Sequence, residues 1–254
     1  MTATPPVALI TGGARRIGRA ITEDLARNGW AVAIHCHNSV DDAEALATEC
    51  RTHGARAAVI EADLVETEAI GAIVSRAEAA LGSVTLLVNN ASIFELDGIG
   101  TLDPELWNRQ MAINLAAPVF LADAFAAALP SGAEGNVVNV IDQRAWKPTP
   151  HYMSYQLAKS ALLVATRTLA QALAPRIRVN AIGPGPTLPS PRQSEADFRR
   201  QAAAIPLQRA TDLADFGRTI RYLVATPSVT GQMIALDGGQ HLAWQTPDIL
   251  GANE

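Results

Sequence analysis

Short apolar runs alternate with amphipathic stretches along the whole chain. The runs are rich in Val, Ile, Leu and Ala, which is typical of strands buried on both faces of a parallel sheet. They predict strands at Val7–Ile10, Ala31–Cys36, Ala57–Glu61, Thr85–Asn89, Asn136–Ile141, Arg178–Ile182 and Met233–Leu236. The stretches between them carry apolar residues at helical spacing. They predict helices at Ile17–Asn28, Asp41–His53, Glu66–Leu81, Pro104–Leu129, Tyr152–Leu173, Ser194–Ala204 and Leu213–Ala225.

This alternation predicts an α/β fold. Strands that alternate with helices build a Rossmann-like, doubly wound parallel sheet, here of about seven strands, with helices on both faces. The 254 residues, 48% of them hydrophobic, match one such domain over residues 1–254, with a single large core.

Charge and cysteine content narrow the class of protein. A net charge of −5 with scattered basic residues argues against a nucleic-acid or anionic membrane surface. The first predicted strand begins too early to leave room for a signal peptide, and no apolar run reaches the ~18 residues of a transmembrane helix. Cys36 and Cys50 have no CxxC partner. We therefore expect two free thiols, no metal site and a cytoplasmic location.

A glycine-rich turn, Thr11–Gly18, joins the first predicted strand to the first predicted helix. Glycines at such a turn let the backbone approach a dinucleotide pyrophosphate, and the helix N-terminus supplies amide donors and a partial positive charge. A small residue is usual at the position of Arg16, so a long cation lies beside the expected cofactor. The turn predicts cofactor contacts from Gly12, Arg15, Arg16, Ile17 and Gly18.

The end of the second predicted strand indicates which dinucleotide binds. A site for NAD usually has a carboxylate there to hold the ribose 2′-hydroxyl. This chain has hydrogen-bonding side chains instead, at His37, Asn38 and Ser39. The nearest carboxylate, Asp41, belongs to the first turn of the next predicted helix. These donors, with Arg15 nearby, suit a 2′-phosphate and predict NADP(H); His35 has no predicted role.

Two further strand ends are candidates for the same cleft. Asp63 and Leu64 follow the third predicted strand and are placed to cap the adenine edge, although a plain turn carboxylate is an equally good interpretation. Polar residues also close the fourth predicted strand, at Asn89, Asn90, Ala91 and Ser92. Asparagines at a strand end hydrogen-bond neighbouring backbones and brace a cofactor cleft.

Tyr155 and Lys159 lie four residues apart, on one face of a predicted helix. An unperturbed phenol with a pKa near 10 is a poor acid–base group at neutral pH, and an adjacent ammonium is expected to lower that pKa.

The irregular stretch Gly183–Gln193 follows a strand and carries Pro184 and Gly185. It therefore lies at the carboxyl edge of the sheet, where we expect a mobile substrate lid.

The chain resembles the short-chain dehydrogenase/reductase family over essentially its whole length. The matching residues are Thr11-Gly12 to Gly18, Asn89-Asn90-Ala91, Asn114, Tyr155, Lys159 and Gly183-Pro184-Gly185. The resemblance implies that Tyr155 is the acid–base residue, that Lys159 tunes it and binds ribose, and that Asn114 holds a proton-relay water. It also implies a homotetramer, with the helix from Asn114 and the helix of Tyr155 packed between subunits. Packing within one subunit would explain the many alanines of the first helix equally well.

The chain departs from the common pattern of this family at Asp142. Most members have a catalytic serine thirteen residues before the tyrosine, and Asp142 occupies that position. A carboxylate beside apolar walls and a bound cofactor is expected to have a raised pKa, to carry a proton, and to accept hydrogen bonds from ring N–H and amino groups. The alternative is a strand-end carboxylate that only caps the following segment.

Several residues together resemble the pteridine reductases of this family, a group that includes dihydromonapterin and dihydrofolate reductases. They are Arg16, Ser92, Phe94, Tyr152 and Asp142. The resemblance implies a pterin ring between the nicotinamide and Phe94, with Arg16 and Ser92 against the cofactor phosphates and the pterin head. Asp142, Tyr155 and Lys159 would deliver protons. Taken singly, Phe94 can be a core residue and Arg16 a phosphate clamp.

The expected activity is NADPH-dependent reduction of a dihydropterin to the tetrahydro form, by hydride transfer to a ring C=N bond with protonation by Tyr155 or Asp142. Dihydrobiopterin, dihydromonapterin and dihydrofolate stay open as substrates. The alternatives are a carbonyl or 3-ketoacyl reductase, an enoyl-thioester reductase that uses Tyr152 and Lys159, and a non-catalytic NADP-binding sensor or scaffold. Four further residues could either shape the pocket or serve only in packing: Trp146, Leu188, His241 and Trp244.

Overall fold

Seven parallel strands form one sheet in the order β3-β2-β1-β4-β5-β6-β7. The computed structural model describes residues 5–190, 192–244 and 246. The strands are β1 (Val7–Ile10), β2 (Ala31–Cys36), β3 (Ala57–Glu61), β4 (Val84–Asn89), β5 (Gly135–Val140), β6 (Ile177–Pro184) and β7 (Met233–Leu236). Because β1 pairs with both β2 and β4, the strand order reverses beside β1. Ligands bind at such a switch point, outside the carboxyl ends of the strands.

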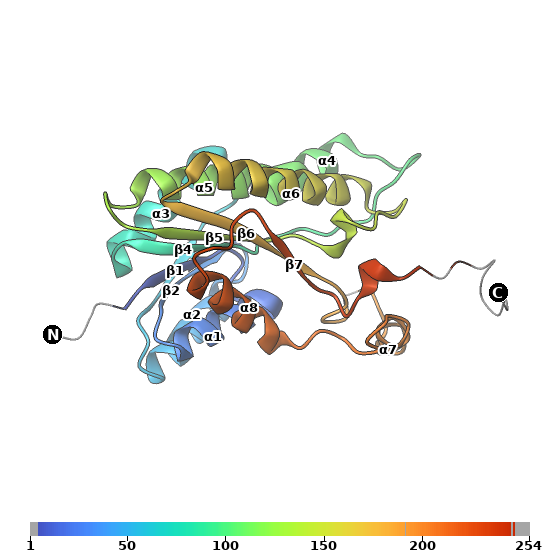
Figure 1. The fold of residues 1–254 in the computed structure, drawn as a ribbon, viewed down its shortest axis with the longest axis horizontal. Coiled ribbons are helices and arrows are strands. Elements are labelled where there is room, and N and C mark those ends of the chain that lie inside the picture. Colours follow the sequence, from blue (N-terminus) through green and yellow to red (C-terminus); the bar gives the residue numbers. More distant parts are fainter. Residues whose placement is uncertain (1–4, 191, 245, 247–254) are drawn as a thin grey trace.

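Helices cover both faces of the sheet, as the alternating pattern predicts (Figure 1). One layer contains α3 (Thr67–Leu81), α4 (Pro104–Met111), α5 (Ala117–Ala128) and α6 (Met153–Leu173). The other contains α1 (Arg16–Arg27), α2 (Val40–Thr52) and α8 (Leu213–Ala225). A shorter helix, α7 (Glu195–Ala203), follows the predicted lid and lies at one end of the molecule.

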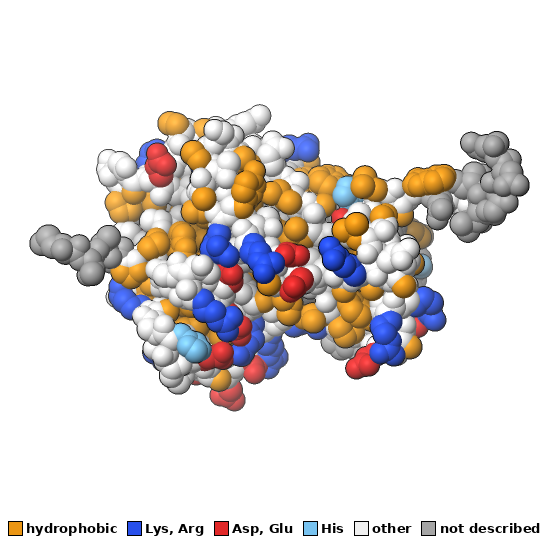
Figure 2. All heavy atoms as spheres, turned by 60° about the horizontal axis from the view of Figure 1, so that its bottom comes forward, with side chains coloured by type: hydrophobic (Ala, Val, Ile, Leu, Met, Phe, Trp, Pro, Cys, Tyr) orange, Lys and Arg blue, Asp and Glu red, His pale blue; other side chains and the backbone are white. Residues whose placement is uncertain are grey.

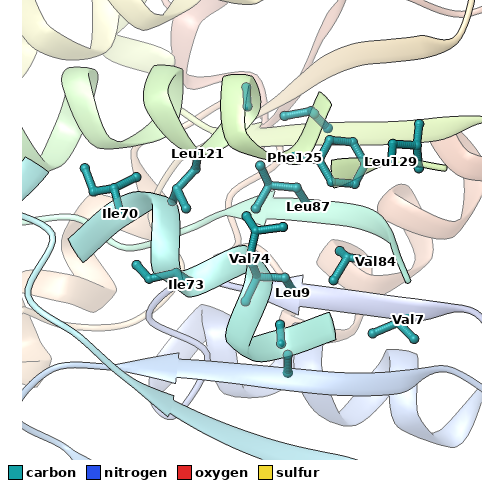
Figure 3. Packing of buried hydrophobic residues seen from close by; sticks show 14 of the residues in the cluster. Val7, Leu9, Ile70, Ile73, Val74, Val84, Leu87, Leu121, Phe125 and Leu129 are labelled. Atoms are coloured by element: carbon teal, nitrogen blue, oxygen red, sulfur yellow. The ribbon is translucent and has the colours of Figure 1, made fainter. Parts of the chain in front are cut away.

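Two hydrophobic cores lie on opposite faces of the sheet because successive strand residues point in opposite directions. Leu9 and Leu87 pack toward α3 and α5 with Val74 and Phe125 (Figure 3). The neighbouring strand residues Ala8, Ile10, Leu86 and Val88 belong to the other core, under α1 and α8. Both thiols, Cys36 and Cys50, are free and buried in that second core. The sheet edge that carries the polar residues is thus held between two packed layers.

The predicted long helix Pro104–Leu129 is interrupted. Residues Ala112–Ala116 form a π-helical turn between α4 and α5, and the Ala117 N–H donates to the Ala112 carbonyl. Pro118 explains the break, since it has no N–H to donate to the carbonyl of Asn114, four residues earlier. Single π-turns inside helices are frequent at functional sites. Here the turn contains Asn114.

The expectation that no stretch of the chain is long and apolar enough for a transmembrane helix is wrong. The helical stretch Pro104–Ala128 is long and apolar enough to cross a membrane, by length and composition alone. Core helices of soluble proteins pass the same test. In this fold α5 contacts α3, β4, β5 and α6, and Leu121 and Phe125 from it are fully buried in the first core.

The remaining element boundaries agree with prediction to within two residues. The largest change is at β6, which extends through Gly183 and Pro184. These two residues therefore belong to the sheet, and the irregular stretch begins at Gly185; residue 191 lies outside the described residues.

On the face shown in Figure 2, Lys and Arg side chains are interspersed with Asp and Glu, so this face has no large area of a single charge sign.

Candidate active site

A cleft of about 1110 Å³ opens at the carboxyl ends of the strands. It extends from the turn after β1, past the ends of β2 and β3, to the ends of β4, β5 and β6. The predicted site residues that line it are Gly12, Arg15, Arg16, Ile17, Gly18, His37, Asn38, Ser39, Asp63, Leu64, Asn90, Ala91, Ser92, Phe94, Asp142, Tyr155, Lys159, Pro184 and Gly185. The only predicted site residue outside this lining is Asn114, which is fully buried behind it.

The turn after β1 has room for backbone only. Gly12 has φ of +59°, and a Cβ there would lie 3.0 Å from the Ala91 Cα. A Cβ at Gly18 would lie 2.1 Å from the Gly12 carbonyl oxygen and 2.5 Å from Asn90 Nδ2. Both glycines are therefore required by close approach. Both glycines also line the cleft at the start of α1, and a helix N-terminus of this kind is where a dinucleotide pyrophosphate binds.

Asn90 holds this turn in place. Its Nδ2 donates to the carbonyls of Thr11 at 2.9 Å and Gly12 at 3.0 Å. In return, the Thr11 hydroxyl accepts from the backbone N–H of Asn90 and of Ala91, each at 3.0 Å. The predicted bracing role of Asn90 is thus visible in the hydrogen bonds between the ends of β1 and β4.

His35 braces the turn from the other side, a role that sequence reasoning missed. Its Nδ1 accepts from the Gly12 N–H at 3.2 Å, and its Nε2 lies 3.2 Å from the Ala62 carbonyl. Burial lowers the pKa of His35 to about 4, so the ring is neutral and Nε2 donates to Ala62. The available signal was a histidine in an otherwise apolar strand, where a buried polar ring needs partners.

The ends of β2 and β3 form the expected adenosine side of the cleft. His37 Nε2 lies 3.7 Å from Asp63 Oδ2, and both side chains are partly exposed. Arg15 pairs with Asp42, in the first turn of α2. The Asp42 partner was not anticipated; it holds the Arg15 guanidinium beside the donors that follow β2.

Asp142 and Tyr155 are in direct contact. The Tyr155 hydroxyl donates to Asp142 Oδ2 at 2.8 Å, while Asp142 Oδ1 accepts from the Arg144 N–H at 2.8 Å. Arg144 NH1 lies 3.5 Å from the same Oδ2. Asp142 therefore caps the segment after β5, as the simpler interpretation held, and also contacts the phenol.

The Tyr155 phenol is protonated at neutral pH. Burial, and then the Asp142 carboxylate, raise the pKa of Tyr155 well above its usual value. This direction is opposite to the one expected from Lys159, whose Nζ lies 5.9 Å from the centre of the Tyr155 ring and donates to the Val140 carbonyl at 2.8 Å. Burial lowers the pKa of Lys159 to about 8. The site thus holds the protonated Tyr155 phenol next to the Asp142 carboxylate, with the buried Lys159 amino group near the phenol ring.

Asn114 orders the loop after β4. Its Oδ1 accepts from the Ser92 hydroxyl at 2.7 Å and from the Ile93 N–H at 3.2 Å. Its Nδ2 donates to the Ile93 carbonyl at 3.0 Å. The side chain is occupied by these contacts, so any proton-relay role stays a prediction.

Three aromatic rings, those of Phe94, Tyr152 and Tyr155, contact one another beside Asp142. Phe94 stacks on Tyr152, with ring centres 4.1 Å apart and planes inclined by 15°, and meets Tyr155 edge-on at 4.7 Å. Two guanidinium groups flank this stack: Arg144 at 5.2 Å and Arg192 at 5.6 Å from the Phe94 ring centre. Sequence reasoning missed both arginines, since neither belongs to a motif.

The predicted lid is joined to the rest of the cleft at two points. Arg16 donates to the carbonyls of Pro189 at 3.0 Å and Leu188 at 3.3 Å. Arg192 donates to the Phe94 carbonyl at 2.6 Å and pairs with Glu95 at 2.9 Å. Arg16 has φ of +52°, a strained value for a non-glycine residue. Contacts of Arg16 with cofactor phosphates and substrate stay a prediction.

Three candidate pocket residues lie outside the cleft lining, and two of them pack on each other. Trp146 and His241 have ring centres 4.9 Å apart, and His241 Nδ1 contacts the buried Asp237 at 2.7 Å. Trp244 is 72% exposed. None of these three belongs to the cleft lining of the described residues, whereas the fourth candidate, Leu188, does.

Comparison with known proteins agrees with this geometry. The family profile described as short chain dehydrogenase matches residues 6–200. The putative ketoacyl reductase 2 of the granaticin polyketide synthase from Streptomyces violaceoruber is 30% identical, over 93% of this chain and 96% of that protein. Among solved structures, the FolM alternative dihydrofolate reductase 1 from Brucella suis, in complex with NADP, is 58% identical, with a TM-score of 0.94 over 98% of this chain and 99% of that one.

The corresponding protein from Brucella canis, also complexed with NADP, is 56% identical, with a TM-score of 0.94 over 97% of this chain and 98% of that one. The fold, the site and these similarities together show that the chain belongs to the short-chain dehydrogenase family and is an oxidoreductase.

Proposed function

We propose that the protein reduces a dihydropterin or dihydrofolate to its tetrahydro form with NADPH. The observation that carries this proposal is the Tyr155 hydroxyl donating to Asp142 Oδ2 at 2.8 Å, next to the Phe94 ring. A serine at residue 142 would polarise a ketone, whereas a carboxylate accepts from the amino and N–H groups of a pterin edge. The two Brucella relatives named as dihydrofolate reductases support the same substrate class.

The cleft fits a bound NADP(H). The Gly12 and Gly18 cradle and the N-terminus of α1 suit the pyrophosphate, and we assign the adenosine 2′-phosphate to Arg15, His37, Asn38 and Ser39. We assign the adenine edge to Asp63 and Leu64, and the nicotinamide side to Asn90, Ala91, Ser92, Lys159, Pro184 and Gly185. When bound, NADPH supplies the hydride. The two crystallised Brucella relatives are complexes with NADP.

The chain's own groups supply the proton. Because burial and Asp142 raise the pKa of Tyr155, the phenol is protonated but is a weaker acid than a free phenol, so it gives up its proton only to the strongly basic ring nitrogen that forms as the hydride arrives. Asp142 accepts from the substrate edge, and it delivers a proton through a water only after it has itself taken up a proton from solvent. Buried Lys159, whose pKa is lowered to about 8, lies beneath the phenol to hold the ribose. Asn114 orders Ser92 beside them.

Aromatic and basic groups shape the substrate side. A flat heteroaromatic ring needs an aromatic surface to stack on, and we assign this role to the Phe94 ring, which lines the cleft and has Tyr152 stacked on it. We place Arg16 and Ser92 near the pterin head, between the cofactor phosphates and the lid. Closure of the lid by Arg16 and Arg192 would exclude water from the reacting atoms.

Reduction of a 3-ketoacyl thioester is the second candidate. It is favoured by full-length relatives at 28–30% identity, which include the 3-oxoacyl-[acyl-carrier-protein] reductase FabG of Staphylococcus epidermidis. Against it stands the contact between Asp142 and Tyr155, since a carboxylate does not polarise a ketone as a hydroxyl does.

We also infer a cytoplasmic homotetramer. Large apolar side chains on the outer faces of α5 and α6 support this assembly: Phe120 is 47% exposed and Val164 is 62% exposed. Exposed apolar groups gathered on neighbouring helices are typical of surfaces that pack against another subunit.

The activity is tested by a substrate panel. NADPH oxidation is followed with dihydrofolate, dihydromonapterin, dihydrobiopterin and a 3-ketoacyl thioester, and each reaction is repeated with NADH. We expect turnover of at least one dihydropterin, with NADPH preferred. Rapid turnover of the thioester without reduction of any pterin would assign the protein to the second candidate. Tight NADPH binding without any turnover would indicate a non-catalytic binder.

A further inference from the structure

Asp97 is a buried carboxylate with no role in the proposed chemistry. It is 2% exposed and lies on the loop after β4, three residues beyond Phe94. Its carboxylate accepts from the Ser154 N–H, at 3.2 Å from both oxygens, and from the Ser154 hydroxyl. Ser154 stands in the first turn of α6, immediately before Tyr155. Asp97 thus joins the loop of the stacking ring to the helix of the acid–base residue, across 57 residues of sequence.

The main chain of Asp97 strengthens the same junction. Its carbonyl accepts from the Tyr152 N–H at 2.8 Å. Tyr152 is left-handed, with φ of +59°, a conformation that persists for a bulky residue only where its surroundings hold it. This conformation accompanies the stacking of the Tyr152 ring on Phe94 at 4.1 Å.

The other side of the loop is tied to the π-turn and α4. Asn114 holds Ser92 and Ile93, and Gln110 Nε2 donates to the Glu95 carbonyl at 3.1 Å. Phe94 therefore lies between two anchors. One fixes the loop to the helix behind the cleft, and Asp97 fixes it to the helix that carries Tyr155.

We propose that Asp97 is a positioning residue that sets Phe94 and Tyr155 in register through its hydrogen bonds to Ser154 and Tyr152. This inference rests on the proposed function, which assigns the substrate to the space beside those two rings. Reaction requires the substrate ring and the proton donor to be aligned closely, and small misplacements slow the chemistry strongly. Loss of the Asp97 contacts should therefore reduce turnover, while NADPH affinity, which rests mainly on the contacts assigned at the turn after β1 and the ends of β2 and β3, changes little.

The test compares Asp97→Ala with a matched cap variant, Asp212→Ala. Asp212 caps α8 by accepting from the Ala214 N–H at 2.9 Å, and neither residue lines the cleft. Both variants lose a carboxylate cap, so both should lower the melting temperature. Only Asp97→Ala should reduce kcat with a dihydropterin, by roughly 10- to 100-fold, with the NADPH dissociation constant changed less than about twofold. Asp97→Asn, which retains an acceptor for the Ser154 N–H, should recover part of the loss.

Ser154→Ala provides a milder variant should Asp97→Ala fail to fold, because it removes one hydroxyl and leaves the backbone contact. Its kcat should fall in the same direction, and the double variant that combines Asp97→Asn with Ser154→Ala should lose less than the product of the two single losses. Unchanged kcat in Asp97→Asn and Ser154→Ala, or an equal kcat loss in Asp212→Ala, would overturn the positioning role. Absence of dihydropterin turnover in the wild-type protein would instead contradict the proposed function.

Discussion

At the scale of single residues, the site depends on how Asp142 and burial act together on Tyr155. The four-residue spacing of Tyr155 and Lys159 correctly placed both groups on one helix face in the cleft. The direction of the pKa change was wrong, because the spacing reveals neither burial nor the carboxylate on a different strand. The phenol is therefore protonated, as a proton donor must be, but its raised pKa makes it a weaker acid than a free phenol.

Because of His35, we expect the folded protein to lose stability as the pH becomes acidic. Its pKa is about 4 in the fold and about 6.5 in an unfolded chain. Below pH 6.5 the unfolded state therefore binds a proton that the folded state rejects, and stability falls as pH falls toward 4. In His35→Gln this contribution should be absent. Urea unfolding at pH 7.5 and pH 5 should show a pH-dependent loss that is about 2 kcal/mol smaller in the variant than in the wild type.

His37→Gln is the control for that measurement, because His37 is half exposed and has no comparable buried hydrogen bonds. Its unfolding free energy should follow the wild-type pH dependence closely. A wild-type slope that survives in His35→Gln would mean that His35 is not the group that titrates.

At the scale of elements, the strands and most helices could be predicted because their signals are local. The apolar runs located all seven strands. The break at Ala112–Ala116 was missed, although Pro118 was the visible signal. The contacts that close the site could not be predicted, because they join residues far apart in sequence: Arg16 reaches Pro189 across 173 residues, and Asp97 reaches Ser154 across 57.

The start of α1 should tolerate no side chain at Gly18. In Gly18→Ala the methyl group would meet the Gly12 carbonyl and Asn90 Nδ2, which would move the turn proposed to hold the pyrophosphate. We expect the NADPH dissociation constant, measured by quenching of protein fluorescence, to rise about tenfold or more. Gly71→Ala in α3 is the control, because nothing lies within 4 Å of its Cβ. It should bind NADPH normally and gain about 0.5–1 kcal/mol of stability. Normal NADPH affinity in Gly18→Ala would remove the turn from the cofactor site.

At the scale of the whole molecule, the fold gathers chemistry from distant parts of the chain at one edge. Parallel strands end together, so the turn after β1, Asn90 after β4 and Asp142 after β5 meet beside α6. Two buried cores hold these strand ends between fixed helix layers. The Tyr155–Lys159 pair matches the family pattern, while Asp142 and Phe94 are the residues that, in the proposed function, favour a flat, nitrogen-rich ring.

The central claim is that a carboxylate at residue 142 determines the substrate class. It is tested most directly by kcat/KM for a dihydropterin and for a 3-ketoacyl thioester, measured in the wild type and in Asp142→Ser at equal NADPH saturation. We predict that the variant loses about 100-fold or more with the dihydropterin and retains or gains activity with the thioester. Equal dihydropterin kcat/KM in the two proteins would contradict the account.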